Sequence, residues 1–287
     1  MHLVESKGLL SAQNGMNIYR GCTHGCIYCD SRSLCYGMDH PFDDVAAKAN
    51  APELLEAALR RKKKRCMIGT GAMSDPYWPG EDELLLTRRC LEVIEKYGFG
   101  LALQTKSANL TRDMDLFDSI NKKAKCVVQM TLTTVDEGLC RKLEPRVSST
   151  NERFNALCAL RELSIPTVVW LSPILPYIND SPENIRGILE YCKEAGVKGV
   201  LCFGMGLTLR EGNREYFYEQ MDRLFPGMSA NYSKKFGSSY VCSSEQEEPL
   251  MRLFVSECDR LGLWHDNNAI FQWMHTLEEQ EEQMRLW

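Results

Sequence analysis

The residues best suited to chemistry lie together in one short segment, residues 17–37, with the sequence NIYRGCTHGCIYCDSRSLCYG. Within it, Cys22, Cys26 and Cys29 follow the spacing C-x-x-x-C-x-x-C. Thiolates are ligands that iron–sulfur clusters and zinc both accept. Cluster ligation normally takes four cysteines, so three cysteines around a cubane would leave one iron open, and an open metal position can bind a small molecule.

A structural zinc site is the alternative interpretation of the same loop. Structural zinc is four-coordinate, so Cys35 or His24 would then supply the fourth ligand. The context of the loop favours a cluster, because the loop follows a first predicted strand and comes before five further strand–helix units. In a cluster site, Cys35 would be a bystander close to the metal.

The elements that must position this loop alternate between short apolar or β-branched runs and longer segments of helical period. Six strand–helix units in series predict an α/β fold with a parallel sheet and right-handed crossovers. Six units are fewer than the eight of a closed barrel, so we expect an open, partial (β/α)6 barrel with its chemistry at the carboxyl ends of the strands. The expected strands are residues 16–21, 66–71, 100–105, 126–133, 167–174 and 199–204.

Helices are expected between these strands, starting near Pro52, Asp82, Thr111, Thr150 and Ser181. Pro suits the first turn of a helix, and Ser or Thr suits the N-cap. The strand–helix rhythm stops at about residue 229. We therefore expect a core domain at residues 1–228 and a C-terminal extension, with a helix and an acidic tail, at residues 229–287.

Several segments together resemble the radical S-adenosylmethionine (SAM) superfamily and, within it, the spore photoproduct lyase-like branch. They are YRGCTHGCIYC, GTGAMSDPY, QTKS, TLTT, LEPR and PILPYINDSPENI, and the resemblance covers about residues 14–225. It implies that Cys22, Cys26 and Cys29 hold a [4Fe–4S] cluster whose open iron chelates SAM. An electron from the cluster, supplied by a donor such as flavodoxin or ferredoxin, would cleave SAM to a 5′-deoxyadenosyl radical that takes hydrogen from a substrate.

The same resemblance implies a set of SAM-binding side chains at successive strand ends. Tyr28 is expected near the adenine, Ser74 and Lys106 match residues that contact SAM in the lyase, and Thr133 stands where a polar contact is expected. Each also has an ordinary explanation, such as a turn hydroxyl or a lysine extended along the surface. The expected cofactor-binding residues are Tyr28, Ser74, Lys106, Thr133, Glu144, Arg146 and Phe203.

The sequence departs from the lyase where that enzyme returns hydrogen to its product. The lyase cysteine before the Ser-Asp pair is Met73 here, and the tyrosine after the last cluster cysteine is Asp30. Methionine has no S–H hydrogen to transfer and aspartate cannot form a phenoxyl radical, so the same relay is not expected. Cys35, Tyr77 and Cys202 are candidate catalytic hydrogen donors in its place, and the sequence does not select among them.

Charge and composition bear on partners and compartment. The net charge of −5 and the pI of about 5.7 argue against strong binding to a phosphate backbone. The basic run at 60–65 is interpreted as a solvated face opposite the active site, and the segment at 231–240 either contacts bases or serves as a connector hairpin. Thirteen cysteines, without an apolar leader or an 18-residue apolar run, predict a cytoplasmic protein with no membrane partner.

The last five residues, QMRLW, resemble the peptide by which bacterial replication and repair proteins dock on the sliding clamp. The matching residues are Gln283, Met284, Leu286 and Trp287. Tethering to a clamp would raise the local concentration near DNA. An apolar terminus folded back on the domain is the alternative.

Three classes of function remain open at this point. The first is a radical SAM enzyme that acts on a DNA lesion or modified base, and the second is one that acts on a protein, peptide or small molecule. The third is a non-catalytic, zinc-stabilised binding module. Iron and sulfide analysis separates the third class from the others, whereas the dependence of 5′-deoxyadenosine yield on DNA separates the first two.

Overall fold

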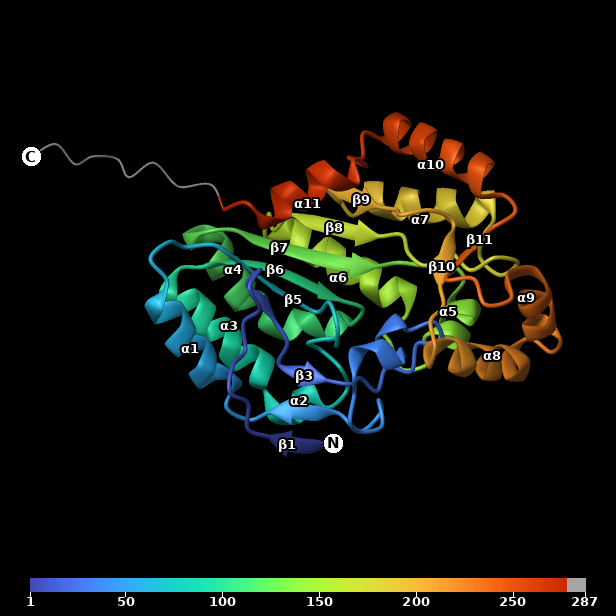
Figure 1. Ribbon diagram of the computed structural model, residues 1–287. Coiled ribbons are helices and arrows are strands. Elements are labelled where there is room, and N and C mark those ends of the chain that lie inside the picture. Colours follow the sequence, from blue (N-terminus) through green and yellow to red (C-terminus); the bar gives the residue numbers. More distant parts are fainter. Residues whose placement is uncertain (278–287) are drawn as a thin grey trace, which may run out of the picture.

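A six-stranded parallel sheet forms the centre of the computed structural model, which describes residues 1–277 (Figure 1). Its strand order is β2–β5–β6–β7–β8–β9, and each neighbouring pair is parallel. The α/β partial barrel predicted from the strand–helix rhythm is therefore confirmed. The strands are β2 (Gly15–Met16), β5 (Met67–Thr70), β6 (Gly100–Thr105), β7 (Cys126–Thr131), β8 (Thr167–Trp170) and β9 (Gly199–Leu201).

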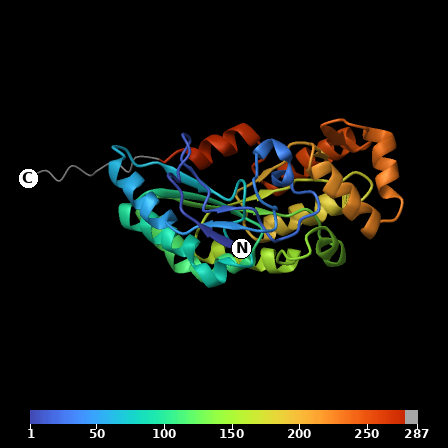
Figure 2. The same cartoon turned by 60° about the horizontal axis from the view of Figure 1, so that its bottom comes forward.

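Helices that connect the strands cover one face of this sheet, as Figure 2 shows. The ends of these helices carry the expected signals: Ser181 caps α7 ahead of Pro182, and Gly98 ends α3 at a φ of 65°. Ser149 rather than Thr150 caps α6, through a capping box with Glu152. These elements are α1 (Ala51–Arg61), α2 (Glu81–Leu84), α3 (Leu86–Tyr97), α4 (Met114–Lys123), α5 (Glu137–Leu143), α6 (Thr150–Glu162) and α7 (Pro182–Glu194).

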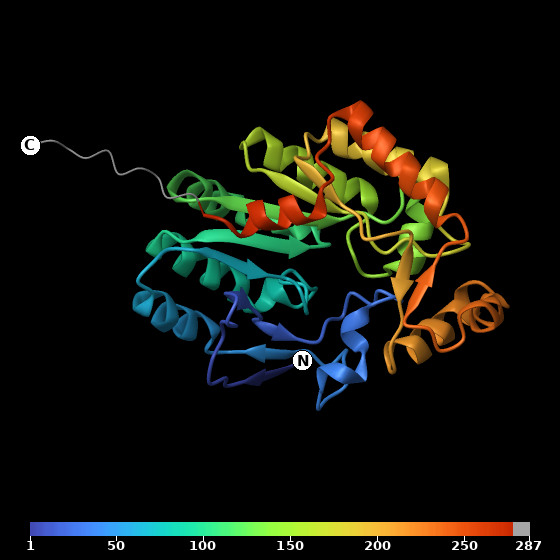
Figure 3. The same ribbon diagram turned by 45° about the horizontal axis from the view of Figure 1, so that its top comes forward.

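The opposite face of the sheet is covered at its amino-terminal half by α11 (Asn267–His275), which lies across the strands (Figure 3). Side chains alternate between the two faces of a strand. One face contributes apolar residues to the main core with the helices, and the other packs on Ile270 and Met274. The strand residues packed with α11 are Met67, Ala102, Val127, Val168 and Leu201.

The strand expected at residues 16–21 is divided between two sheets. Its first part is β2, whereas β3 (Tyr19–Arg20) pairs antiparallel with β4 (Ala46–Lys48), and β4 pairs parallel with β1 (His2–Val4). The helix expected from Thr111 begins at Met114, after a 3₁₀ turn at Ala108–Asp113. The cysteine loop thus starts from β3, beside the sheet that holds the other site residues.

The C-terminal part adds a small hairpin sheet and four helices. β10 (Gly206–Thr208) pairs antiparallel with β11 (Val241–Ser243), joined through α8 (Asn213–Leu224) and α9 (Met228–Phe236). The segment at 231–240 is thus mainly helix, with Tyr232 and Phe236 buried beside Phe217. α10 (Glu247–Leu261) lies against α7. Elements after residue 228 pack on elements before it, as α10 does on α7. The division of the chain into two domains at residue 228 therefore stays a prediction. Among residues 1–277, no helix is long and apolar enough to cross a membrane.

Candidate functional site

The cysteine loop brings three thiols to the border of one small cavity. Cys22, Cys26 and Cys29 line this space of about 130 Å³, which we call the cysteine cavity. Gly21 allows the turn into the loop, because its φ of 95° suits glycine and a Cβ there would overlap the carbonyl of Phe42. Burial raises the pKa of Cys22 to about 12 and also raises the pKa of the other two thiols. Ionising them therefore requires a compensating cationic centre.

The two residues considered as a fourth zinc ligand lie in different places. Cys35 lies on an exposed turn, where its Sγ accepts a hydrogen bond of 3.3 Å from Arg210, and it does not line the cysteine cavity. His24 does line that cavity, with its Nδ1 3.6 Å from a carboxylate oxygen of Asp75, and burial lowers its pKa. No three His, Cys, Asp or Glu side chains within residues 1–277 surround a position for a single metal ion.

The loop after β5 forms the next wall of the cysteine cavity and contributes Met73 and Ser74. Gly71 is required where the loop begins: its φ is 97°, and a Cβ would overlap the carbonyl of Gln104 on β6. The carboxylate of Asp75 then ties this loop to β6 by accepting hydrogen bonds from Thr105 Oγ1 at 2.6 Å and from the Lys106 amide at 2.7 Å. The predicted SAM contact Ser74 thereby lines the same cavity as the three cysteines.

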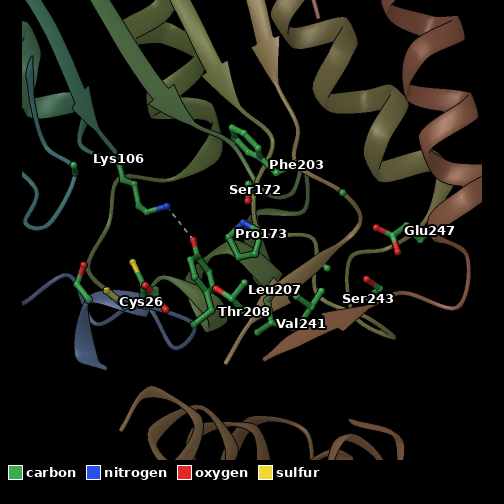
Figure 4. A pocket seen from close by; sticks show the side chains of 17 residues that line it. Cys26, Lys106, Ser172, Pro173, Phe203, Leu207, Thr208, Val241, Ser243 and Glu247 are labelled. Carbon is green, nitrogen blue, oxygen red and sulfur yellow. Dashed lines mark hydrogen bonds between the residues drawn. The ribbon is translucent and has the colours of Figure 1, made fainter. Parts of the chain in front are cut away.

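Lys106, at the end of β6, is the centre of a polar network beside the thiols (Figure 4). Its Nζ donates to the Tyr28 hydroxyl at 3.2 Å and lies 3.5 Å from Glu144 Oε1. Tyr28 in turn donates to Glu144. Burial alone would raise the pKa of Glu144, but Arg153 and Lys106 outweigh it and lower that pKa to about 2. The carboxylate therefore stays ionised and holds both partners in place.

Arg153 is the member of this network that the sequence reasoning missed. Its side chain is fully buried, with one guanidinium nitrogen 2.5 Å from Glu144 and another donating to the carbonyl of Thr131 at 2.7 Å. The available signal was a charged residue in the apolar stripe of a helix, with Leu157 and Leu160 on the same face. Arg146, predicted in this role, is exposed, and its backbone amide donates to the carbonyl of His24.

The polar residue that reaches the cysteine cavity from β7 is Thr131, whereas Thr133 borders neither this cavity nor the larger one beside it. The carbonyl of Thr133 accepts from Asn179 at 2.7 Å and from Asn184 at 2.9 Å. Its buried hydroxyl has no hydrogen-bond partner among the described residues. Thr133 therefore lies in the loop that follows β7, two residues beyond Thr131, which lines the cysteine cavity.

A larger cavity of about 390 Å³ adjoins the thiols, and we call it the hairpin cavity because β10 and β11 form one wall (Figure 4). Cys26, Cys29 and Lys106 line both cavities, so the two spaces meet at the cluster loop and at the end of β6. Phe203 lines the hairpin cavity with 57% of its surface exposed and packs on Trp170 at a ring distance of 5.6 Å. An aromatic face, a cation, hydroxyls and the carboxylates of Asp30 and Glu247 thus surround this space.

The three candidate hydrogen donors lie outside both cavities. Tyr77 is buried and donates to a carboxylate oxygen of Asp113 at 2.9 Å. Cys202 is buried with its sulfur 3.8 Å from that of Met251, and Cys35 is on the exposed turn already described. The cysteines that line the cavities are the three of the loop. The residues predicted for clamp binding, 283–287, lie outside the described residues.

A parallel partial barrel with a three-cysteine loop at the carboxyl edge of its strands defines the radical SAM class of enzyme. The chain belongs to the radical SAM superfamily, whose family model matches residues 16–187. It is 28% identical over 242 residues to an uncharacterized protein of Mycobacterium tuberculosis, covering 82% of this chain and 71% of that one. It is 34% identical over 167 residues to an uncharacterized protein of Methanocaldococcus jannaschii, covering 58% of this chain and 61% of that one.

Solved structures of spore photoproduct lyase share this fold. One variant aligns with a TM-score of 0.67 at 13% identity, over 92% of this chain and 80% of that one. Another, with bound AdoMet and dinucleoside spore photoproduct, aligns with a TM-score of 0.62 at 14% identity, over 88% and 75%. A radical SAM methyltransferase from Kitasatospora setae, with cobalamin and a [4Fe–4S] cluster bound, aligns with a TM-score of 0.53 at 14% identity. The alignment covers 73% of this chain and 37% of that one. The resemblance inferred from the motifs is confirmed.

Proposed function

We propose that Cys22, Cys26 and Cys29 hold a [4Fe–4S] cluster and that the adjoining cavities take SAM. When bound, these groups supply a 5′-deoxyadenosyl radical that abstracts hydrogen from a substrate. The single observation that supports this assignment is the convergence of three thiols with Ser74, Lys106 and Thr131 on one cavity. These residues come from four separate segments of the chain, whereas a turn with only a structural role would involve one segment.

The chain's own residues would then bind and orient the cofactor. Lys106 presents its ammonium group where the two cavities meet, and Tyr28 and Glu144 fix its direction. Such a cation suits the carboxylate of an amino acid moiety. The exposed ring of Phe203 suits an adenine face, since aromatic side chains stack on bases. Ser74 adds a hydroxyl beside the thiols.

For the substrate, we propose a DNA lesion or a modified base. The support is the fold shared with a lyase whose structure holds a dinucleoside photoproduct. Met73 lines the cysteine cavity and Asp30 the hairpin cavity, so the residues that depart from the lyase face the site itself. A different reaction outcome is therefore expected even on a related substrate. A protein, peptide or small molecule is the competing class.

The cofactor assignment is tested on anaerobically reconstituted full-length protein. About four irons and four sulfides per chain are expected, together with 5′-deoxyadenosine formation under reductant. Cys26→Ala should abolish both, whereas Cys35→Ala, on the exposed turn, should keep both. A single zinc per chain without SAM cleavage would instead support the zinc-stabilised module.

The substrate class is tested by the same assay with and without DNA. Stimulation of 5′-deoxyadenosine formation by DNA, weakened as salt rises, supports the nucleic-acid proposal. Deuterium transfer from a labelled substrate into 5′-deoxyadenosine identifies the hydrogen that is abstracted. Equal yields with and without DNA, combined with transfer from a labelled peptide or metabolite, would favour the competing class.

A further inference from the structure

A third cavity, of about 650 Å³, lies on the α11 side of the sheet, between the segment 11–17 and α11. We call it the interior cavity. It shares Ala72 and Gln104 with the cysteine cavity, so it opens beside the thiols rather than at a remote surface. Its size lies within the range of small-molecule sites. Figure 3 shows α11 crossing the strands that form its floor.

The chemistry of this lining is unusual for a protein with 25% charged residues. None of the side chains that line the interior cavity is an Asp, Glu, Lys or Arg. The amino-terminal end of this sheet face is apolar and packed on α11, and Lys106 stands at its carboxyl end. Between these two zones the lining is polar, and His275 is the one ionisable side chain in it. An ionic ligand group would lose its hydration there without a partner charge.

Two carboxamides lie at the centre of this polar zone. Gln104 and Gln129 are direct neighbours in the register of β6 and β7. Gln129 is only 6% exposed, and its Oε1 accepts a hydrogen bond from Trp170 Nε1 at 3.0 Å. That bond fixes the amide so that its Nε2 remains a donor without a partner among residues 1–277, and Gln104 likewise makes no side-chain hydrogen bond there. Neither carboxamide is among the fully buried groups that lack a partner, so both are open to the cavity, where a ligand can pair with them.

Aromatic rings border the same space and restrict the shape of that ligand. Trp170 and Phe271 line the cavity with their rings 5.6 Å apart, and His275 stacks on Phe271 at 6.2 Å with 9° between the planes. Flat aromatic walls favour a planar ring. The basic residue Lys62 does not line the cavity, but its Nζ donates to Oδ1 of the lining residue Asn14 at 2.6 Å. The charge of this lysine is therefore held outside the lining.

We propose that the interior cavity binds the reacting part of the substrate, and that this part is an uncharged planar ring with a lactam or amide edge. The edge pairs with the carboxamides of Gln104 and Gln129, and the ring packs on Trp170. This inference rests on the proposed function, because the ring is placed to meet chemistry that begins at the cysteine cavity. Any phosphate or carboxylate of a larger substrate lies outside the cavity.

The test uses matched rings that differ in charge. Binding of uracil and of orotate, which is the same ring with a carboxylate, is measured by equilibrium dialysis on full-length protein. Two forms are used: the cluster-free protein and the reconstituted protein with SAM and no reductant. We expect uracil to bind at least about tenfold more tightly than orotate in one or both forms, since the carboxylate would be buried unpaired.

Gln104→Met and Gln129→Met remove the amides while keeping the side-chain length, and each should weaken uracil binding by about fivefold or more. Gln220→Met, on α8 far from the cavity, is the matched control and should change nothing. Circular dichroism confirms that each variant is folded. Equal binding of the two rings, no binding in either form, or no loss in both amide variants would overturn the inference. The yield of 5′-deoxyadenosine is measured separately. Cleavage of SAM without a preference for uracil over orotate refutes only this inference. A preference for uracil without cleavage of SAM refutes the proposed function.

Discussion

At the scale of single residues, the site depends on a buried carboxylate that organises two functional side chains. Glu144 contacts Tyr28, Lys106 and Arg153, and both Glu144 and Arg153 have fully buried side chains. A buried ion pair contributes little net stability relative to a hydrophobic pair, but removing one partner leaves the other charge buried and uncompensated. The network is therefore better understood as a device for fixing Lys106 at the border of the two cavities.

Glu144→Gln is expected to lower the free energy of unfolding by about 3–5 kcal/mol, because Arg153 would be left without a counter-charge. Urea unfolding followed by circular dichroism measures the loss. Arg146→Ala is the control: this residue is exposed, so a change within about 0.5 kcal/mol is expected. Equal losses in the two variants would contradict the assignment of Arg153, rather than Arg146, as the partner of Glu144.

The depressed pKa of Glu144 also predicts a dependence of stability on pH. A carboxyl whose pKa falls from 4.5 in the unfolded chain to about 2 in the folded one contributes stability above the higher value. That contribution is lost as the pH falls from about 5 towards 2. Unfolding free energies measured across this window should therefore decrease less steeply for Glu144→Gln than for the parent protein. If the unfolding free energies of the two proteins fell equally steeply with pH, other carboxylates would account for the loss of stability in acid.

At the scale of elements, the loop after β5 is shaped by a close approach between two strands. Gly71 leaves no space for a Cβ beside the carbonyl of Gln104, whereas a Cβ at Gly69, two residues earlier, would lie 4.0 Å from the carbonyl of Ala102. Gly69 lies within β5, whereas Gly71 directly follows the strand and has a positive φ. The strand thus provides its own matched pair for testing how the loop is built.

Gly71→Ala is expected to cost about 1–3 kcal/mol of stability, since alanine disfavours this backbone region and would displace the loop. The displacement moves Ser74 away from the thiols, so SAM cleavage should fall more than stability alone explains. Gly69→Ala should leave the unfolding free energy nearly unchanged. Chemical denaturation, together with the rate of 5′-deoxyadenosine formation, compares the two variants. A tolerated Gly71→Ala would show that the loop adapts without glycine.

Elements whose signals are local could be predicted from the sequence. The parallel sheet of six strands and the cysteine loop were predicted, whereas the roles of Tyr28, Lys106 and Glu144 in binding SAM stay predictions. Contacts between distant segments could not be predicted: α11 covers the inner face of strands that lie more than 60 residues earlier in the chain. Alternation along β7 places residues 129, 131 and 133 on one face, so Thr131 and Thr133 are separated only by the end of the strand at Thr131.

At the scale of the whole molecule, the C-terminal part closes the site on two sides. β11 forms part of the wall of the hairpin cavity, and α11 covers the apolar half of the inner sheet face. Ile270 and Met274 are completely buried against strands of the barrel. A barrel without these residues would expose the apolar ends of five strands to water. The residues after 228 are therefore expected to fold together with the barrel, although the rhythm of the sequence changes there.

Met274→Ala tests this dependence, because it removes a buried side chain at the interface between α11 and the sheet. The expected loss is about 2–5 kcal/mol, and it should appear in one transition that far-UV circular dichroism and tryptophan fluorescence report at the same denaturant concentration. Val255→Ala, at a site with 40% exposure on α10, should change stability little. Two separate transitions, with Met274→Ala shifting only the weaker one, would instead support an independently folding domain at residues 1–228. Limited proteolysis distinguishes the same alternatives, since a stable fragment ending near residue 228 can accumulate only if the barrel survives without α11.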